Sequence, residues 1–375
     1  MSAEYAEYSV DAEIATFFAQ TSATRSACDV KAKELAGGDV VPVDVQGVCS
    51  YSVYAGKDLE YVVQFRLGAL ALNADVISLA STIYGKLAPT VSYRGTIGDR
   101  GSSLCIYLMS RVRGITYLNY ILAHGYPADS AVNVSRRKVL LGDVAHFMAL
   151  SWKGAQVVSD GYRTELRGRY IEDLENLHEN LPERFKRFIC SCLDSIDAIM
   201  ALPMVLLHKD FGDCNIMVDE VTCHLVGVID WAEAEICPFG LNLHSLQPLT
   251  GRLHLRNGWT RLEDYDVLQE LFWTRFVEEV CGLSEETLRT IKLARVLGLL
   301  LSAGFPSRLS NQVKPKPIGN DEQGRYKTLS LEGFLIDPKS KFDGLGPTNR
   351  FTRLYSWIGR WNQRCDCLLA IIKRE

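Results

Sequence analysis

The hydrophobic pattern of the chain changes its period near Gly114, and this change limits the possible folds more strongly than any other feature. Segments 40–56 and 90–112 each contain two strand candidates around a glycine turn, and 61–67 alternates like a fifth strand. Segment 69–87 has helical spacing. After Gly114 the apolar residues recur with helical spacing. Strands followed by helices predict an α+β fold, with a small antiparallel sheet carrying one helix and a larger, mainly helical part.

Helical spacing also marks the N-terminus and most of the second half of the chain. Residues 1–37 form a predicted helical extension of an N-terminal lobe, 1–110, and a C-terminal lobe takes 111–375. Segment 306–348 is rich in Gly, Pro and Lys and has no clear period, which favours a lid or a flexible loop. Further helices are predicted at 115–126, 136–155, 184–202, 262–280, 284–301 and 349–373.

Net charge and hydropathy argue against several classes of protein. The 375 residues carry a formal net charge of −4, so the whole chain has no electrostatic reason to bind nucleic acid or an anionic membrane. The acidic N-terminus is unlike a signal or transit peptide. The apolar stretch at 296–305 is shorter than the roughly 20 residues that span a bilayer. We expect a cytoplasmic protein with no nucleic-acid partner and no membrane; the oligomeric state stays open.

The cysteines do not have the spacing of a zinc site. None of the 11 forms a CxxC pair, and the CxC pairs Cys190/Cys192 and Cys365/Cys367 have no matching second pair. This pattern favours scattered buried thiols in a reducing compartment over a zinc site or a disulfide framework.

Polar residues cluster around one predicted hairpin in 206–235. Strand candidates 216–218 and 224–229 flank a turn, so antiparallel pairing would bring Asn215 beside Asp230. The loop before Asn215 hangs over the same edge and adds Asp210. Oxygen donors with incomplete coordination suit Mg²⁺, which keeps some of its waters and shares phosphate oxygens. A chance coincidence of turn residues is the alternative.

The pattern His208-x-Asp210-x-x-x-x-Asn215, followed by Asp230 after a hairpin, resembles the catalytic and metal-binding loops of the kinase fold. The form IDW at 229–231 looks like the aminoglycoside phosphotransferase and choline kinase-like family, the small-molecule branch of that fold. With the element order of the first lobe, the resemblance covers about 40–305. It implies a protein-kinase-like bilobal fold. The implied activity is an ATP- and Mg²⁺-dependent phosphotransferase that moves the γ-phosphate to a hydroxyl of a small molecule.

The resemblance also implies roles for individual residues. Asp210 matches the catalytic base, which orients the acceptor hydroxyl and takes its proton in the transition state. Asn215 and Asp230 match the magnesium ligands. His208 matches the histidine whose packing and hydrogen bonds hold the loop in shape, so its role is structural.

The nucleotide half departs from the family pattern. The third strand, YVVQFRL, has no lysine, so Arg66 is the candidate cation for the nucleotide phosphates and Gln64 the second choice. Asp75 lies at about the position of the helix acid that should hold this cation. An exposed strand cation is the alternative for Arg66. The departure puts the affinity for ATP, and the choice between ATP and GTP, in doubt.

Two further segments match the nucleotide site with less specificity. Loop 47–52 lies where the phosphate-covering loop is expected, and there Ser50 and backbone N–H groups could contact phosphate. Segment 107–114 resembles the hinge, where backbone groups near Met109 and Arg111 would face the adenine edge. A plain turn is the alternative at the hinge.

The sequence indicates few candidate residues for the acceptor site. The densely charged segment 160–185 could suit a cationic acceptor, but a solvated helix face explains it better. Segment 238–249 could line the acceptor site with Asn242 or His244. The missing strand lysine motivates a second hypothesis, a catalytically inactive kinase-fold protein that binds a metabolite or a partner. No APE-like activation segment follows Asp230, which argues against a protein kinase.

Overall fold

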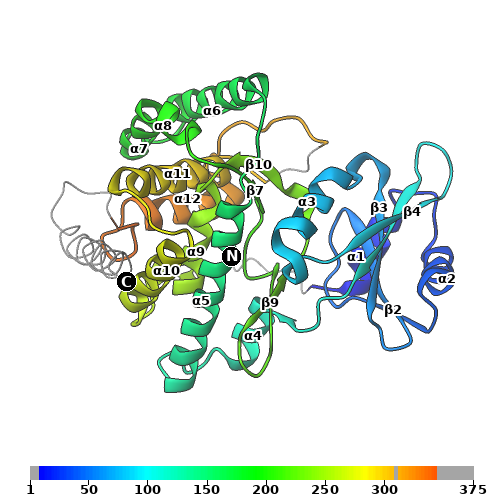
Figure 1. Cartoon of the computed structure of the whole chain (residues 1–375). Helices are drawn as coiled ribbons and strands as arrows, with labels where there is room; N and C mark the ends of the chain where they lie inside the picture. Colours follow the sequence, from blue (N-terminus) through cyan, green and yellow to red (C-terminus); the bar gives the residue numbers. More distant parts are fainter. Residues whose placement is uncertain (1–7, 308–310, 344–375) are drawn as a thin grey trace, which may run out of the picture. The chain divides into compact units, whose positions relative to one another are not determined.

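The computed structural model describes residues 8–307 and 311–343, and the chain divides into two compact units (Figure 1). The first unit consists of Met1–Gly154, Leu206–Ile236 and Arg308–Lys314, and the second of Ala155–Val205, Cys237–Ser307 and Pro315–Glu375. Two of the crossings between the units lie within β7 (Met204–Leu207) and β10 (Glu235–Pro238). The expected boundary between lobes at residues 110 and 111 stays a prediction.

The first unit contains a five-stranded antiparallel sheet of the predicted kind. Its strand order is β1-β2-β3-β5-β4. Helix α3 (Ala74–Tyr84) follows the third strand, after the 3-10 turn η1 (Gly68–Leu70), and a second such turn, η2 (Gly85–Leu87), leads to the fourth strand. The element order confirms the predicted fold class. The strands are β1 (Asp39–Pro42), β2 (Ser50–Gly56), β3 (Tyr61–Leu67), β4 (Val91–Ile97) and β5 (Leu104–Ser110).

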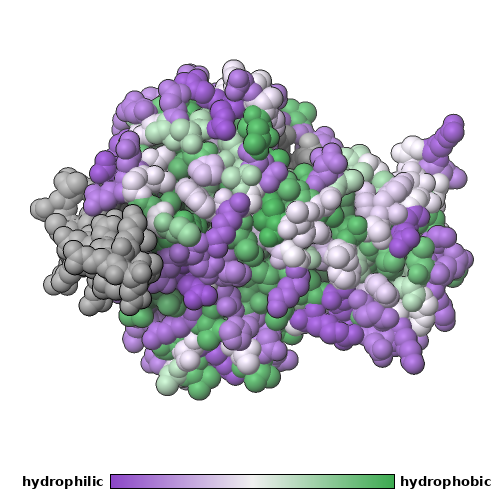
Figure 2. Space-filling model, in the orientation of Figure 1, coloured by the Kyte–Doolittle hydropathy of each residue, from purple (hydrophilic) through white to green (hydrophobic). Residues whose placement is uncertain are grey.

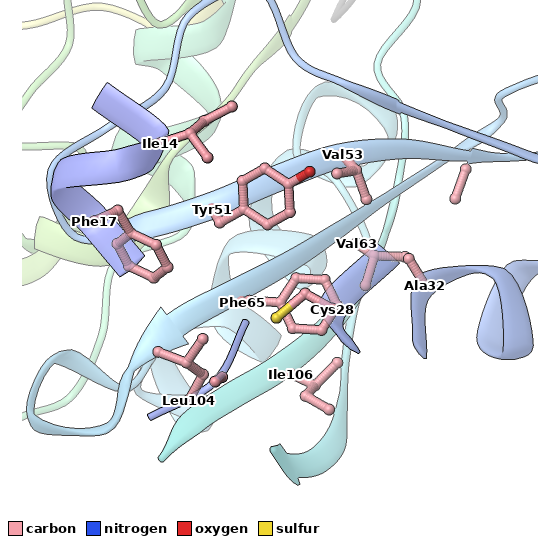
Figure 3. Close-up of a cluster of buried hydrophobic side chains, with 12 residues drawn as sticks. Ile14, Phe17, Cys28, Ala32, Tyr51, Val53, Val63, Phe65, Leu104 and Ile106 are labelled. Atoms are coloured by element: carbon pink, nitrogen blue, oxygen red, sulfur yellow. The ribbon is translucent and has the colours of Figure 1, made fainter. Parts of the chain in front are cut away.

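Two N-terminal helices contribute to the core of this sheet. Helix α1 (Val10–Phe18) starts at the cap Ser9, and α2 (Arg25–Ala36) starts at the cap Thr24 and ends at Gly37, whose φ is +70°. Alternate residues of β2 and β3 point to one face, so their apolar side chains meet those of the helices. Both helices lie within residues 1–37, where a helical extension was predicted; residues 1–7 lie outside the described residues. Figure 3 shows the shared core, which includes Ile14, Phe17, Cys28, Ala32, Tyr51, Val53, Val63, Phe65, Leu104 and Ile106.

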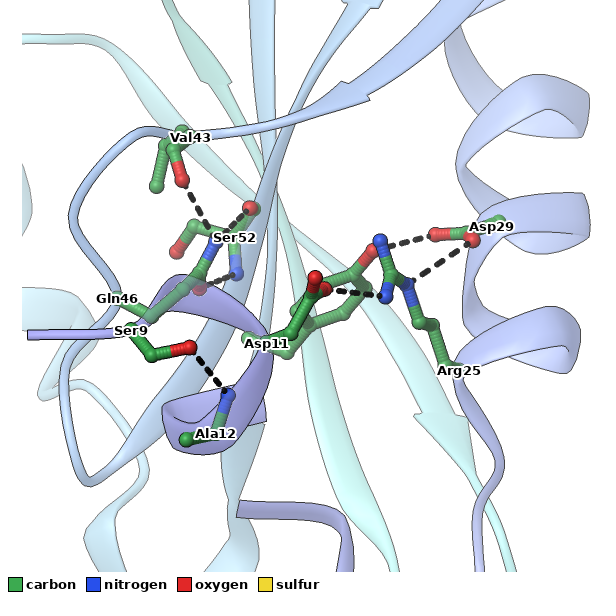
Figure 4. Close-up of polar contacts among 9 residues, drawn as sticks. Ser9, Asp11, Ala12, Arg25, Asp29, Val43, Gln46 and Ser52 are labelled. Atoms are coloured by element: carbon green, nitrogen blue, oxygen red, sulfur yellow. Dashed lines mark hydrogen bonds and ion pairs between the residues drawn. The ribbon is translucent and has the colours of Figure 1, made fainter. Parts of the chain in front are cut away.

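Polar contacts at the edge of this core join the helices to the sheet (Figure 4). Arg25 contacts Asp11 at 3.2 Å and Asp29 at 4.0 Å. The Tyr51 hydroxyl donates to Asp29 at 2.7 Å, which gives a buried phenol its partner. Since the ion pairs are exposed, we expect the Tyr51 hydrogen bond to be the more important of these contacts.

A short linker joins this sheet to a second, three-stranded one in the same unit. Strand β6 (Ile115–Thr116) pairs with β8 (Ile216–Val218), which pairs with β9 (Leu225–Val228). Gly114 permits the close approach, because an added Cβ would lie 2.5 Å from the carbonyl oxygen of Val218. Helices α4 (Tyr117–His124) and α5 (Ala131–Lys153) follow, and both contact this small sheet. The predicted hairpin therefore lies in the same unit as the five-stranded sheet.

The second unit is mainly helical, and α11 (Glu285–Ala303) is its central helix. It contacts α6, α7, α8 and α12 and the 3-10 turn η4 (Leu241–Ser245). Gly298 allows the last contact, because an added Cβ would lie 1.7 Å from the carbonyl oxygen of Leu241. The other elements are α6 (Asp160–Asn180), α7 (Glu183–Asp194), α8 (Ile196–Met200), α9 (Leu246–Thr250), β11 (Gly251–His254), β12 (Gly258–Arg261), α10 (Tyr265–Glu279) and α12 (Glu322–Leu335).

Helix α6 has the solvated face that its charge pattern indicates. It buries one stripe, Leu166, Tyr170, Leu174 and Leu177, at spacings of three and four residues. Figure 2 shows hydrophilic residues gathered over this helix at the top of the view. None of the helices in the described ranges is both long and apolar enough to cross a membrane.

The structure corrects the interpretation of segment 306–348. Residues of α12, Glu322–Leu335, form a regular helix capped by Asp321, so this part is not a flexible loop. Leu331, Phe334 and Leu335 are buried at helical spacing, whereas the Gly, Pro and Lys residues around the helix conceal its period. The helix predicted at 349–373 lies outside the described residues.

Candidate functional site

His208 ties the loop after β7 to the end of the hairpin. The residue is only 1% exposed, and its Nε2 lies 2.8 Å from the carbonyl oxygen of Ile229. The ring packs edge-on against Trp231 at a centroid distance of 4.9 Å. Burial lowers the pKa of His208, although the bond to Ile229 and the nearby carboxylates act in the opposite direction. A neutral imidazole that donates from Nε2 fits the structural role predicted for this residue.

Asp210 and Asn215 meet directly. The Nδ2 of Asn215 donates to the carbonyl oxygen of Asp210 at 2.8 Å and to its Oδ2 at 3.0 Å. The loop between them is anchored from outside by the backbone N–H of Leu118, at the start of α4, which donates to the carbonyl oxygen of Asp213 at 2.9 Å. These bonds fix the direction of the Asp210 carboxylate.

The hairpin brings Asp230 to the same end. The backbone N–H of Ile229 donates to the carbonyl oxygen of Asn215 at 3.0 Å, so Asp230 follows directly beside Asn215. Asp230 has φ +60° and ψ +66°, a left-handed conformation that Asp tolerates better than most residues. The 3-10 turn η3 (Trp231–Glu233) follows at once. The structure therefore brings the three predicted oxygen-bearing side chains to one end of the hairpin.

The electrostatics of this end act on Asp210. Loss of hydration raises the pKa of the Asp210 carboxyl, and the negative charges of Asp230 and Asp213 raise it further. His208 and the hydrogen bond from Asn215 lower the same pKa; each acts less strongly than the loss of hydration and more strongly than either negative charge. The result is a carboxylate that is more basic than an ordinary Asp.

The donor atoms fit a hard cation. The Oδ1 of Asn215 and the carboxylate of Asp230 have no hydrogen-bond or ion-pair partner among the described residues, since Asn215 uses its Nδ2 toward Asp210. In the same part of the chain no three His, Cys, Asp or Glu residues cluster as a metal site. A cation at Asn215 and Asp230 would therefore need ligands from water or from a bound anion, as Mg²⁺ commonly has.

Arg66 lies inside the five-stranded sheet and not on its surface. It is 5% exposed, and its Nε donates to the carbonyl oxygen of Leu70 at 2.5 Å. Ser50 is its partner across β2 and β3 and is also buried. Gln64, the second choice, donates to the hydroxyl of Ser52 at 3.3 Å. The alternative of an exposed strand cation does not hold for Arg66.

Cys49 places the loop before β2 near the hairpin end. Burial raises the pKa of its thiol most, and the charge of Arg66 lowers that pKa while those of Asp230 and Glu233 raise it. The backbone N–H of Leu67 donates to the carbonyl oxygen of Cys49 at 3.1 Å, so this loop lies beside the strand end that carries Arg66, and the charge of Asp230 also reaches the thiol. Because Cys49 carries no charge signal in the sequence, sequence reasoning did not identify it.

Asp75 does not hold Arg66. It is exposed in the first turn of α3, where its backbone N–H donates to the cap Asn73 at 3.0 Å. The described residues contain no ion pair between Asp75 and Arg66. A carboxylate at this position favours the helix through the macrodipole.

The hinge candidates Met109 and Arg111 differ in how their backbone groups are bonded. Met109 lies within β5, paired with Val62 on one side and Val91 on the other. The backbone N–H of Arg111 donates to the carbonyl oxygen of Glu60 at 2.9 Å, and its guanidinium stacks on Tyr54 at 3.7 Å. The backbone of Arg111 is therefore engaged within the unit.

Val112 lies next to the hinge candidates and was not identified by the sequence analysis. Its backbone N–H has no partner among the described residues. Its side chain packs on the hairpin, because an added Cβ at Gly227 would lie 2.8 Å from Cγ1 of Val112. Val112 stands out only because the backbone N–H of Arg111 beside it is bonded to Glu60. This contact is visible in the structure and leaves no signal in the sequence.

Comparison with known proteins agrees with this geometry. A model of the phosphotransferase enzyme family matches residues 60–261. No curated protein matches the chain.

Solved structures similar to the chain include three proteins. An aminoglycoside phosphotransferase APH(3'')-Id from Streptomyces rimosus is 15% identical over 74% of this chain and 99% of its own, with a TM-score of 0.42. A putative aminoglycoside phosphotransferase from Ralstonia eutropha is 12% identical over 82% and 96%, with a TM-score of 0.47. An ethanolamine kinase from Plasmodium vivax is 11% identical over 87% and 94%, with a TM-score of 0.45. Such low values carry no inference about the substrate.

Proposed function

The chain belongs to the phosphotransferase enzyme family, and from this premise we propose that it moves the γ-phosphate of ATP, with Mg²⁺, to a hydroxyl of a small molecule. The observation that carries the proposal is the meeting of Asp210, Asn215 and Asp230 at one end of the hairpin. Phosphoryl transfer depends mainly on positioning and on stabilising charge. The oriented carboxylate of Asp210 can position the acceptor, and the free oxygen atoms of Asn215 and Asp230 can bind a cation that stabilises charge.

Asp210 is proposed to receive the acceptor. Its Oδ2 accepts from Asn215, whereas Oδ1 has no partner in the described part of the chain. The free oxygen can accept a hydrogen bond from a hydroxyl and orient it. A pKa raised above that of an ordinary Asp makes this carboxylate a better base for the proton that leaves the hydroxyl in the transition state.

Asn215 and Asp230 are proposed to hold Mg²⁺ through Oδ1 and the free carboxylate. When bound, the ion neutralises negative charge on the β- and γ-phosphates. His208 contributes indirectly, because its bond to Ile229 keeps the residue before Asp230 in place.

Arg66 is proposed to face the nucleotide phosphates. Its Nε is engaged with Leu70, which leaves the two terminal nitrogens for phosphate oxygens. Ser50 lies directly across from it and can add a hydroxyl. The free backbone N–H of Val112, next to Met109 and Arg111, is the better candidate for the adenine edge.

One observation favours the second hypothesis, an inactive binding protein. Arg66 is fixed by a backbone carbonyl and has no carboxylate partner in the described residues. An active kinase fold pairs the corresponding cation with an acid of the following helix, and Asp75 does not form that pair. A thermal-shift titration with Mg-ATP and Mg-GTP separates the hypotheses in part. A lack of any shift at millimolar nucleotide favours the inactive protein.

The decisive experiment follows labelled γ-phosphate from ATP into a pool of small-molecule metabolites. We expect a labelled product with the wild-type chain and Mg²⁺, and none in EDTA. Asp230→Ala should raise the Mg²⁺ concentration needed for half-maximal rate, because one of two protein ligands is lost. If the Mg²⁺ dependence of Asp230→Ala equals that of the wild type, the ligand role is wrong.

A further inference from the structure

Arg295 is a buried cation without a counter-charge of its own. It lies in the middle of α11 and is 3% exposed. Its guanidinium stacks on the ring of Phe342 at 3.9 Å, yet it makes no hydrogen bond or ion pair within the described residues, and its Nε is fully enclosed. A buried charge without a partner is strongly unfavourable, so such a group indicates a missing ligand.

Further cations surround Arg295. Burial and then the charge of Arg295 lower the pKa of Lys292, one turn earlier on α11, to about 8, while the charge of Asp343 acts in the opposite direction. Burial and then the charges of Arg295 and Lys327 lower the pKa of His244 to about 4. These effects place Lys292 and His244 near Arg295, and Lys327 near His244. His244 is neutral at pH 7.

The acid whose charge acts on Arg295, Asp343, is already engaged. Asp343 accepts from the guanidinium of Arg261 at 2.9 Å and from the Tyr265 hydroxyl at 3.4 Å. Its charge reaches Arg295 but is shared with Arg261. Lys327, whose Nζ donates to the carbonyl oxygen of Ser302 at 2.7 Å, has no acid either. Among the described residues, Arg295 and Lys327 therefore have no acid of their own.

We propose that the second unit contains an anion-binding site at Arg295 for an oxyanion group of a small molecule, with Lys327 on the side of their shared neighbour His244. A planar guanidinium can grip a carboxylate or a phosphate through two parallel hydrogen bonds, and both groups share this chemistry. All residues of the site belong to the second unit and none takes part in the proposed phosphotransfer. The inference goes beyond that function and does not depend on it.

The test is a thermal-shift titration of the full chain in EDTA at constant ionic strength, with chloride as the reference anion. Inorganic phosphate and malonate are the probes for the two sources of an oxyanion. We expect one or both to raise Tm saturably, on the order of a few degrees, because a ligand that binds only the folded chain stabilises it. If neither probe changes Tm relative to chloride, the inference is wrong.

Three variants show which residues the anion-dependent rise in Tm requires. Arg295→Met keeps the length of the side chain without its charge, so the free protein should melt at the same or a higher temperature and the response should be lost. Arg289→Met, at an exposed position of the same helix, should keep the response. Lys327→Met should raise the half-saturating probe concentration several-fold and covers the case in which Arg295→Met fails to fold. A response retained by both Arg295→Met and Lys327→Met overturns the proposal.

Discussion

At the scale of the residue, the geometry of Asp210 sets both reactivity and a cost in stability. Its pKa is raised in the folded chain, chiefly by loss of hydration, so the folded state binds this proton more tightly than the unfolded state does. The folded state therefore loses stability as pH rises from the unfolded pKa through the raised one. At neutral pH this penalty is present but small, because the Asp210 side chain is exposed to solvent.

Asp210→Asn removes this penalty together with the base. We expect turnover to fall by about 10²-fold or more, while Tm at pH 7.5 rises relative to wild type and the difference shrinks as the pH falls. Steady-state rates and Tm at several pH values measure both. Asp266→Asn, an exposed acid in the first turn of α10, is the control and should change neither much. A lower Tm for Asp210→Asn at pH 7.5 would contradict the assignment.

A second prediction concerns pH. Because the base must be ionised, the rate should fall as the pH drops through the raised pKa of Asp210, above the range of an ordinary Asp. The negative charge of Asp213 contributes to that raised value, so Asp213→Asn should move the acid limb of kcat/KM to lower pH and leave the plateau nearly unchanged. A pH–rate profile decides it. If the acid limb of kcat/KM lies at the same pH in Asp213→Asn as in the wild type, a group other than Asp210 controls that limb.

At the scale of the element, close backbone contacts decide where helices can lie. Gly298 lets α11 pack directly on the carbonyl of Leu241, whereas Gly168 in α6 has nothing within 4 Å of an added Cβ. Gly298→Ala should destabilise the chain by about 2 kcal/mol or more, because a Cβ at 1.7 Å forces the elements apart.

The matched control uses the same substitution on another helix of the same unit. Gly168→Ala should stabilise the chain by about 0.5–1 kcal/mol, since Ala loses less backbone entropy in a helix. Urea denaturation of both variants measures the two free energies of unfolding. Equal effects would mean that the packing of α11 on η4 is not tight.

At the scale of the whole molecule, the reactivity of each cysteine thiol depends on whether its surroundings exclude solvent. The described residues hold nine free cysteines, of which four are buried and three are exposed. Burial raises the pKa of Cys28, Cys192 and Cys223 to about 12, which keeps these thiols protonated and unreactive.

We expect brief alkylation of the native chain at pH 8 to modify the exposed thiols Cys190, Cys214 and Cys281 and to spare the buried ones. Peptide mass spectrometry measures the extent at each site, and the same reaction in urea is the control for intrinsic reactivity. Cys214 lies between Asp213 and Asn215, so Mg-ATP should slow its reaction more than that of Cys281. Rapid native alkylation of Cys28 or Cys192 would contradict the packing described for either unit.

The sequence by itself determined the order of strands and helices and the meeting of Asp210, Asn215 and Asp230. Both are local: hydrophobic period decides element type, and a hairpin brings residues near in sequence together. It missed α12 because Gly and Pro around the helix conceal its period. Tertiary structure alone decided that Arg66 is buried against Leu70 and that Asp75 is not its partner. It also decided that Arg295 is enclosed among other cations, because burial and charge there come from segments far apart in the chain.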